Sequence, residues 1–529
     1  MVFQSLVGKL SDVSAAIEPT YAVCGLLLAP VALALMRSKF PALEDQKLLG
    51  VPPSTKPIVN NTVEFATRTD DFHDWLLSLC EHFQGQPFLL RTVGQPDMVV
   101  LYTTEAVEDV FKTHFERFPK GKYQCDTMRD MLGNGIFASD GATWSHQRKV
   151  GSNLFTARTL RDTMTQSIRK HAVVLRRILH EAGTQDKTID IFKLFNRFTI
   201  EAFSEIGFGI EMKSMEAEEE HPFQTAFDRV QRTVMLRFVR PAWFWRSQRV
   251  LQVGAERQLR EDVETIDRIV LDIIAQSFKL RQTNEHRNGP ADIVSLFLDQ
   301  YENSPESKNG DFDPQYLRDI VVNFLIAGRD TTAQALSWFF LNVTKHPHVV
   351  TKIRAEMKEL LPELMAGTID TPTMEHVQRL TYLEAAVKES LRLYPAVPFT
   401  VKWTKEDVVL SDGTLVRKGQ LAAIPSYAYS RMQHVWGPDA ATYNPGRWID
   451  PATGKLINVS AFKFFAFNAG PRTCLGMNLA LLEMKIVVAS LLSRLNIEVI
   501  EPEKVTYDLS LTLPVRGELL TRITPYKAE

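Results

Sequence analysis

The sequence is poor in cysteine, and its four cysteines, Cys24, Cys80, Cys125 and Cys474, show no paired spacing. Disulfide frameworks and zinc sites need paired or clustered cysteines, so we exclude both. No stretch rich in glycine, serine or proline divides the middle of the chain, and no internal repeat stands out. A formal charge of −2 over 529 residues gives no reason to expect a nucleic-acid partner.

An uncharged, largely apolar run extends from Tyr21 to Met36 and is interrupted by Pro30. Spanning a bilayer takes about 20 residues, so this run is short unless its flanks contribute. A cleaved signal peptide fits less well, because Asp12 and Glu18 precede the run and no small-residue cleavage site follows it. A re-entrant hairpin at Pro30 is the other alternative. Basic residues follow the run, so the positive-inside rule leaves the rest of the chain in the cytoplasm.

The chain therefore divides into a short N-terminal part and one large domain. Length alone would suggest about three average domains, but the lack of an internal linker is compatible with one. We predict a tail at residues 1–18, a transmembrane anchor at 19–38, a stiff proline-containing linker at 39–58 and a globular domain at 59–529.

The periodicity of the globular part is mostly helical. Two apolar runs, Phe88–Val93 and Met98–Tyr102, flank a Gly-Gln-Pro-Asp turn and predict a β-hairpin. Helical spacing dominates from Glu105 to about residue 395, and short strands return after that. This profile predicts a mainly α fold with small β-sheets.

A single cysteine lies between two glycines in the segment from Phe467 to Gly476, directly before apolar residues at helical spacing. Cys474 is thus expected at the mouth of a helix, where free N–H groups and the helix dipole favour an anion. Such a place lowers a thiol pKa and favours the thiolate, which is the form that binds metal. Gly470 and Gly476 would leave room for a flat cofactor, and Arg472 offers charge to an anionic group. A buried, inert cysteine is the alternative.

A long helix is predicted from Asp313 to Thr344. Asp313 can cap its start, Pro314 suits the first helical position, and His346-Pro347 ends it. Within it lies Ala327-Gly328-Arg329-Asp330-Thr331-Thr332. Glycine at mid-helix costs about 1 kcal/mol relative to alanine, so it requires an explanation.

Thr331 can donate a hydrogen bond to the carbonyl of Ala327 four residues earlier and open a notch in this helix. An ordinary buried helix containing a glycine is the alternative.

Trp144 and Arg148 are four residues apart, so both can donate to one carboxylate from the same helix face. A surface helix with an amphipathic tryptophan would show the same spacing.

The pattern Phe-x-x-Gly-x-Arg-x-Cys-x-Gly at residues 467–476 resembles the haem-ligand loop of the cytochrome P450 family, in which a cysteine thiolate is the axial iron ligand. The resemblance implies the P450 fold and haem b, with Cys474 as metal ligand. One animal branch bonds haem covalently through a glutamate where this chain has Ala327, so non-covalent haem is expected. The implied haem contacts are Trp144, Arg148, Lys402, Phe467, Arg472, Cys474 and Gly476.

The same resemblance assigns roles on two helices. Asp330 and Thr331 match the oxygen-activation motif, in which the alcohol donates to bound dioxygen and the acid links to a proton relay. Glu389 and Arg392 match a buried structural pair that a later arginine completes, here Arg447. Gly446 stands where a glutamate is common, which does not exclude that pairing.

The reaction implied is insertion of one oxygen atom of O2 into a C–H bond. Electrons would come from a separate membrane-bound NADPH–cytochrome P450 reductase, since no flavin or nicotinamide domain is found. Lys463, Arg472 and Lys485 could help the reductase to dock. The N-terminal run resembles the single-pass endoplasmic-reticulum anchor of eukaryotic members, with the catalytic domain facing the cytoplasm.

Phe324–Ala333 and Phe118–Gly121 look like the branch that hydroxylates fatty acids and alkanes at the chain end, as in plant and fungal fatty-acid ω-hydroxylases. Arg91 is the one candidate for holding a fatty carboxylate. Alternatives are a haem-thiolate isomerase or dehydratase on lipid peroxides, a non-catalytic membrane haem binder, and a monooxygenase on alkanes, sterols or xenobiotics. The implied substrate-channel residues are Ile136, Phe137, Ile326, Ala327, Val397 and Leu513.

Overall fold

The computed structural model describes residues 49–217, 220–282, 292–302 and 313–527. The predicted tail, the predicted anchor and the first half of the predicted linker lie outside these ranges. Within the described residues, none of the helices combines the length and the apolar character needed to cross a bilayer.

Helices make up most of the molecule, and the strands are short. The α-helices are α3 Thr62–Thr67, α4 Phe72–Phe83, α5 Thr104–Glu108, α6 Gly121–Leu132, α7 Gly141–Ser152, α8 Ala157–Thr159, α9 Thr165–Thr184, α10 Ile191–Phe208, α11 Pro222–Val239, α12 Ala242–Leu251, α13 Gly254–Gln282, α14 Ile293–Glu302, α15 Pro314–Lys345, α16 Pro347–Leu360, α17 Pro362–Ala366, α18 Met374–Gln378, α19 Thr381–Leu393, α20 Ser426–Tyr429, α21 Gln433–Trp436 and α22 Met477–Leu492. The strands are β1 Phe88–Leu90, β2 Met98–Val100, β3 Ile189–Asp190, β4 Thr400–Trp403, β5 Val408–Val409, β6 Leu415–Val416, β7 Leu421–Ile424, β8 Leu495–Val499 and β9 Leu520–Pro525. Short 3-10 or π segments are η1 Asp109–Thr113, η2 Phe115–Arg117, η3 Asn153–Phe155, η4 Leu160–Met164, η6 Pro445–Trp448, η7 Phe465–Phe467, η8 Gly470–Arg472 and η9 Pro502–Lys504.

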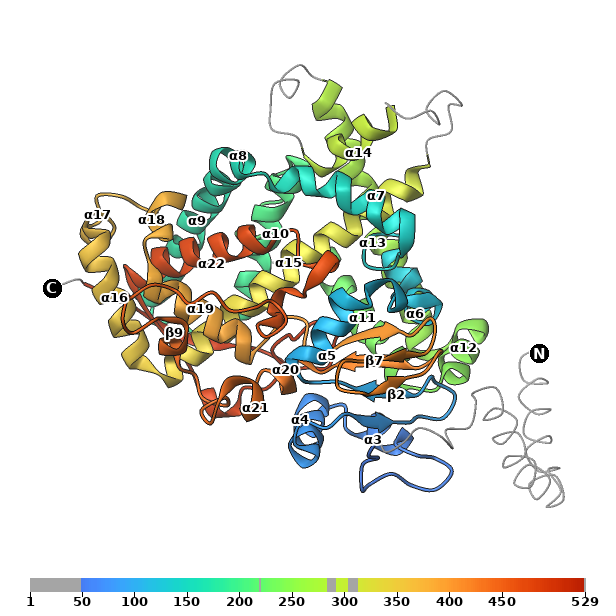
Figure 1. Cartoon of the computed structure of the whole chain (residues 1–529). Helices are drawn as coiled ribbons and strands as arrows, with labels where there is room; N and C mark the ends of the chain where they lie inside the picture. The colour runs from blue at the N-terminus through green and yellow to red at the C-terminus, as the bar shows by residue number, and fades with distance from the viewer. Residues whose placement is uncertain (1–48, 218–219, 283–291, 303–312, 528–529) are drawn as a thin grey trace, which may run out of the picture.

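Helix α15 passes through the middle of the molecule, with α10 and α22 packed on it (Figure 1). Its boundaries follow the predicted signals. The Asp313 carboxylate accepts a hydrogen bond of 2.9 Å from the backbone N–H of Gln315, and Pro314 occupies the first turn. The helix ends at Lys345, directly before His346-Pro347. Nearly every residue from Leu317 to Val343 is buried, so neighbouring elements cover this helix on all sides.

The predicted hairpin is confirmed, because β1 and β2 pair antiparallel with Phe88 opposite Val100. β2 also pairs in parallel with β7, and β4 completes a sheet of order β1-β2-β7-β4. Segments from both ends of the domain therefore meet in one sheet, at the lower right of Figure 1. The other sheets have the orders β3-β9-β8 and β5-β6. The fold is mainly helical with small sheets in a single domain, as predicted.

Candidate active site

The cysteine loop folds back on itself between η8 and α22. The backbone N–H of Cys474 donates a hydrogen bond of 2.9 Å to the carbonyl of Phe467. Asn468 adopts a φ of 61° and a ψ of −176°, a strained conformation that is rare for residues other than glycine. These features hold Cys474 one turn before α22 begins at Met477.

The thiol of Cys474 has some solvent-exposed surface, yet protein atoms surround most of it. Burial raises the pKa of the Cys474 thiol, and this outweighs the N–H of Gly476 and the charge of Arg148, which both lower it. The N–H at the helix start does lower the pKa, but desolvation is the larger effect, so the predicted net lowering of the Cys474 pKa is wrong. Binding of a metal cation at sulfur would reverse the balance, since a coordinating thiol loses its proton.

The two glycines of the loop serve different purposes. Gly470 has a φ of 63°, and a Cβ there would clash with the backbone carbonyl of Phe111 in η1. Protein packing, rather than room for a cofactor, therefore explains Gly470, which corrects the sequence-based interpretation. A Cβ on Gly476 would lie 3.5 Å from Phe155 and 4.0 Å from the Cys474 sulfur, which are ordinary contact distances, so packing within the protein does not require this glycine.

Trp144, Arg148 and Arg472 come together beside the loop, as predicted from the sequence. The guanidinium of Arg472 lies 4.3 Å from the centre of the Trp144 ring and donates to the Asp140 carboxylate at 2.6 Å. Arg148 donates to the backbone carbonyl of Thr473 at 2.8 Å. The ion pair between Arg472 and Asp140, at the start of α7, and the hydrogen bond from Arg148, within α7, thus both connect this helix to the cysteine loop.

Lys402 on β4 points into the same region and is only 2% exposed. Neither its Nζ nor the Nε of Arg472 has a hydrogen-bond partner among the described residues. Burial, together with Arg472 and Lys120, holds the pKa of Lys402 well below its usual range. Burial and Arg472 likewise lower the pKa of Lys120 to about 8. The sequence analysis did not name Lys120 as a site residue, although it singled out the segment Phe118–Gly121 that contains it.

Buried cations without partners are costly, so this cluster is suited to an anionic ligand. Asp140 is the nearest carboxylate and is already shared by Arg472 and the backbone N–H groups of Lys120 and Gly121. The Cys474 thiol lies in the same region as Lys402, whose Nζ has no partner among the described residues, and Arg472, whose Nε has none. This arrangement fits an iron porphyrin with its two propionates. Phe467, the remaining predicted contact, ends η7 in the same loop.

The predicted hydrogen bond within α15 is present, with Thr331 donating to the Ala327 carbonyl at 2.8 Å. The helix is nevertheless continuous from Pro314 to Lys345, so the predicted notch does not interrupt it. Gly328 has another explanation, because a Cβ there would clash with the ring of Phe203 on α10. Close packing of two helices therefore requires this glycine.

Asp330 is buried and held by two neighbours. Gln231 of α11 donates to it at 2.6 Å and Arg329 at 2.8 Å. Arg329 also pairs at 2.7 Å with Asp228, whose side chain is 60% exposed. Burial raises the pKa of Asp330 to about 6, although Arg329 opposes this. The sequence analysis missed Gln231 and Arg329, although an arginine inside an apolar helix signals a buried partner.

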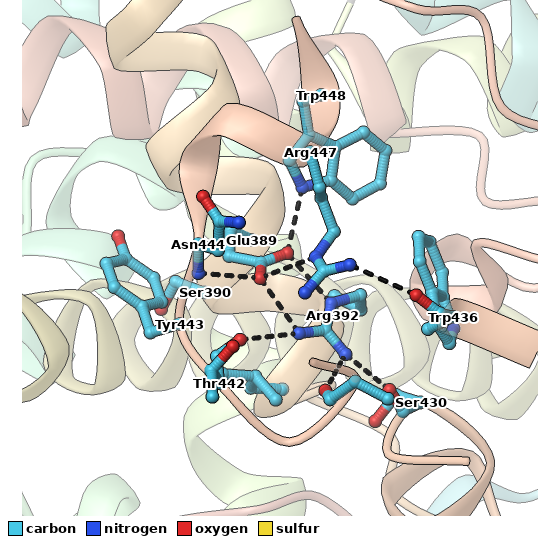
Figure 2. A network of polar contacts seen from close by, with 12 residues as sticks. Glu389, Ser390, Arg392, Ser430, Trp436, Thr442, Tyr443, Asn444, Arg447 and Trp448 are labelled. Carbon is cyan, nitrogen blue, oxygen red and sulfur yellow. Dashed lines mark hydrogen bonds and ion pairs between the residues drawn. The ribbon is translucent and has the colours of Figure 1, made fainter. Parts of the chain in front are cut away.

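Glu389, Arg392 and Arg447 form the predicted trio on α19 and η6 (Figure 2). Glu389 accepts two hydrogen bonds of 2.8 Å from Arg392, one of 2.9 Å from Arg447 and one of 2.9 Å from the Trp448 indole. Arg392 also donates to backbone carbonyls, including that of Ala440 at 2.6 Å. The network joins α19 to the loops at 430–448, and Gly446 does not disturb it.

The predicted substrate-channel residues lie on elements that meet α15. Ile326 and Ala327 are part of α15, and the backbone N–H of Phe137 donates to Asn323 of α15 at 2.9 Å. Phe137 and Val397 are exposed apolar side chains, whereas Ile326 and Leu513 are buried. Ile136 precedes Phe137 and is half-buried.

The backbone N–H of Leu513 bonds to Gln334 of α15 and to the carbonyl of Ala396, next to Val397. Arg91, the predicted carboxylate candidate, instead pairs with Asp97 at 3.5 Å within the β1–β2 hairpin.

Two of the three residues predicted to help a reductase dock are not available for it. Lys485 is buried and pairs with Glu384 at 2.7 Å, and Arg472 is engaged with Asp140. Lys463 lies over the ring of Trp436 at 4.9 Å. Helical spacing alone did not reveal that Lys485 faces the core of the protein.

Comparison with known proteins agrees with this geometry. The family described as Cytochrome P450 matches residues 51–527. The chain is 33% identical over 504 residues to "Cytochrome P450 86B1" of Arabidopsis thaliana, covering 93% of this chain and 87% of the relative. It is 34% identical over 514 residues to "Cytochrome P450 704C1" of Pinus taeda, covering 93% and 96%. It is 31% identical over 487 residues to "Cytochrome P450 monooxygenase cyp1" of Mycosarcoma maydis, covering 89% and 75%. The chain belongs to the cytochrome P450 family and is a P450 monooxygenase.

Proposed function

We propose that this P450 monooxygenase hydroxylates long-chain fatty acids at or near the chain end. The proposal rests on the resemblance of Phe324–Ala333 and Phe118–Gly121 to the fatty-acid ω-hydroxylase branch. We further propose that electrons reach it from a separate NADPH–cytochrome P450 reductase.

Haem b would be held non-covalently by the cysteine loop and the cation cluster. Cys474 would bind the iron, and Lys402, Arg472 and Lys120 would neutralise the propionates. Trp144 and Arg148 would also contact the haem. Arg148 in addition holds the cysteine loop in place through its hydrogen bond to the carbonyl of Thr473. When bound, thiolate-ligated haem supplies the chemistry of O2 reduction and O–O cleavage.

The observation that carries a monooxygenase reaction is the acid–alcohol pair on α15. The hydroxyl of Thr331 donates its single proton to the Ala327 carbonyl in this structure, so it would donate to a bound ligand after rotating away from that carbonyl. Asp330 has a pKa of about 6, so it can take up and release protons near neutral pH. Gln231 and Arg329 keep its carboxylate in place.

Exposed apolar side chains support a location at a membrane. Trp243, Val250 and Leu251 on α12 are 62%, 81% and 69% exposed, and Ile58 and Val63 near α3 are 56% and 51% exposed. Both α3 and α12 pack on α11. Large exposed apolar groups mark surfaces that meet a partner or a bilayer. With the predicted anchor at 19–38, they favour the cytoplasmic face of the endoplasmic reticulum.

A haem-thiolate isomerase or dehydratase on lipid peroxides is the alternative reaction. It has no use for a proton relay to bound oxygen, so Asp330 and Thr331 argue against it. If the reaction is monooxygenation, the alternative to a fatty-acid substrate is another lipophilic molecule, such as an alkane, a sterol or a xenobiotic.

Incubation with reductase, NADPH and a panel of fatty acids tests the proposal. We expect NADPH- and oxygen-dependent products, with the hydroxyl placed at or near the chain end by mass spectrometry. Rearrangement of lipid hydroperoxides without NADPH would favour the isomerase. Hydroxylation of sterols or aromatics alone would overturn the fatty-acid assignment.

A further inference from the structure

A pocket of about 180 Å³ lies between α3, the C-terminal half of α11 and the segment at 508–509. Its apolar wall contains Leu236, Val239 and Leu509, and two guanidinium groups, those of Arg232 and Arg240, also line it. An apolar wall with cations at one side suits a ligand that has an anionic head and a hydrocarbon body.

Most charges of this pocket are already paired. Its two carboxylates are Asp508, which lies 3.5 Å from Arg232, and Asp70, which lies 3.2 Å from Arg516. Arg240 forms no ion pair within the described part of the chain, and its guanidinium lies 5.9 Å from the Phe244 ring. Arg240 is therefore the charge that remains for a ligand.

Arg240 is also held in place by its backbone. It caps the C-terminus of α11, and its carbonyl accepts a hydrogen bond of 2.7 Å from the side chain of Gln95. A fixed backbone reduces the entropy lost when the guanidinium binds an anion.

Helix α11 connects this pocket to the catalytic pair. Gln231 contacts Asp330, and Arg240 follows nine residues later, which corresponds to about 14 Å along a helix axis. One leaflet of a bilayer, which a long acyl chain fills, is about 15 Å thick in its hydrocarbon part. Nine residues are also about two and a half turns, so Arg240 and Gln231 leave α11 on opposite sides. A long acyl chain with its head at Arg240 would therefore pass around α11, on the side of Leu509, to reach Asp330.

A second element makes the same connection. Leu509 lines the pocket, and four residues further on Leu513 donates from its backbone N–H to Gln334 at 3.0 Å. Gln334 lies on α15, three residues after Thr331. Helix α11 and the segment from Leu509 to Leu513 therefore both run from the pocket toward the part of α15 between Asp330 and Gln334.

We propose that this pocket binds the carboxylate of a long-chain fatty acid through Arg240, with the chain lying along α11 toward Asp330 and Thr331. The identity of this ligand rests on the proposed function. The arrangement places the carboxylate far from the reacting carbon, as hydroxylation at the chain end requires.

Isothermal titration of the full-length holoenzyme with hexadecanoate and with its methyl ester tests the proposal. Arg240→Leu should weaken hexadecanoate binding about tenfold or more, because a charge-assisted hydrogen bond is lost, and should leave methyl ester binding unchanged. Arg240→Lys should restore part of the affinity, since it keeps the charge but loses the fork. Arg257→Leu, an exposed arginine of α13 outside the pocket, is the matched control and should bind like the wild type.

Equal hexadecanoate binding by the wild type and Arg240→Leu would overturn the proposal, even if fatty acids are hydroxylated. So would a wild type that does not bind hexadecanoate, or one that binds hexadecyl phosphate in its place through Arg240. Conversely, Arg240-dependent binding without any hydroxylated product would support the pocket and contradict the proposed function.

Discussion

The side-chain amide of Gln231 donates a hydrogen bond of 2.6 Å to the carboxylate of Asp330 and thereby joins α11 to α15. The same helix α11 carries Arg240 at its end, beside the pocket. Movement of α11 would consequently change the surroundings of both the proposed substrate head and the catalytic acid.

Loss of the Gln231 amide is expected to move the pH dependence of turnover. The hydrogen bond from Gln231 lowers the pKa of Asp330, which burial raises to about 6, so Gln231→Leu should raise that pKa further. The midpoint that Asp330 contributes to the pH profile of kcat should therefore move to higher pH. Gln224→Leu, another buried glutamine on α11, should leave the profile unchanged. An unshifted profile in Gln231→Leu would mean that Asp330 does not limit proton delivery.

Cys474→Ala should abolish thiolate ligation. The reduced, carbon-monoxide-treated holoprotein should lose its thiolate-type Soret band, because no sulfur remains at the iron. Cys80→Ala, at a free and buried cysteine on α4, should keep the band. Persistence of the band in Cys474→Ala would remove the basis of the whole site assignment.

Glu389→Gln should destabilise the protein strongly. It leaves two guanidinium groups, those of Arg392 and Arg447, without their shared carboxylate, and breaking a buried charge network costs about 3 to 5 kcal/mol. Urea unfolding followed by circular dichroism measures this loss. Glu406→Gln removes an exposed pair with Arg117 and should cost less than about 1 kcal/mol. Similar losses in both variants would contradict a structural role for the trio.

Gly328→Ala should also destabilise the protein, although alanine is ordinarily better than glycine in a helix by about 1 kcal/mol. The added methyl group would clash with Phe203, so the α10–α15 packing must open. Phe203→Leu in the same chain should recover part of the stability by providing space. If Gly328→Ala raises the thermal midpoint on its own, helix packing is not the reason for this glycine.

Glu483 on α22 predicts a pH-dependent stability. Burial raises its pKa to about 8, so between its unfolded value of 4.5 and about 8 the folded state binds a proton that the unfolded state has released. Stability is therefore lost as pH rises through this window. Glu483→Gln should stabilise the protein by up to a few kcal/mol above pH 8 and have little effect below the unfolded pKa. Equal stability of the two proteins at pH 9, measured by urea unfolding, would refute this.

Local features of the chain were readable in advance because they depend on spacing within one element. The cap at Asp313, the bond from Thr331 to Ala327 and the pairing of Glu389 with Arg392 all join residues two to four positions apart. Helical geometry alone brings such side chains together. The hairpin of β1 and β2 belongs to the same class, since its turn determines its register.

Contacts between distant elements were decided only by the tertiary structure. No spacing reveals that Gln231 meets Asp330, that Lys402 and Arg472 share one buried region, or that β2 pairs with β7. Packing also changed the reasons for two glycines and the pKa of Cys474, because steric clashes and desolvation depend on neighbours from other segments. The sequence by itself indicated the cytochrome P450 family through one short loop, since the residues of that motif lie within a few positions of each other. The pocket beside Arg240 emerged only when α3, α11 and the segment at 508–509 were brought together.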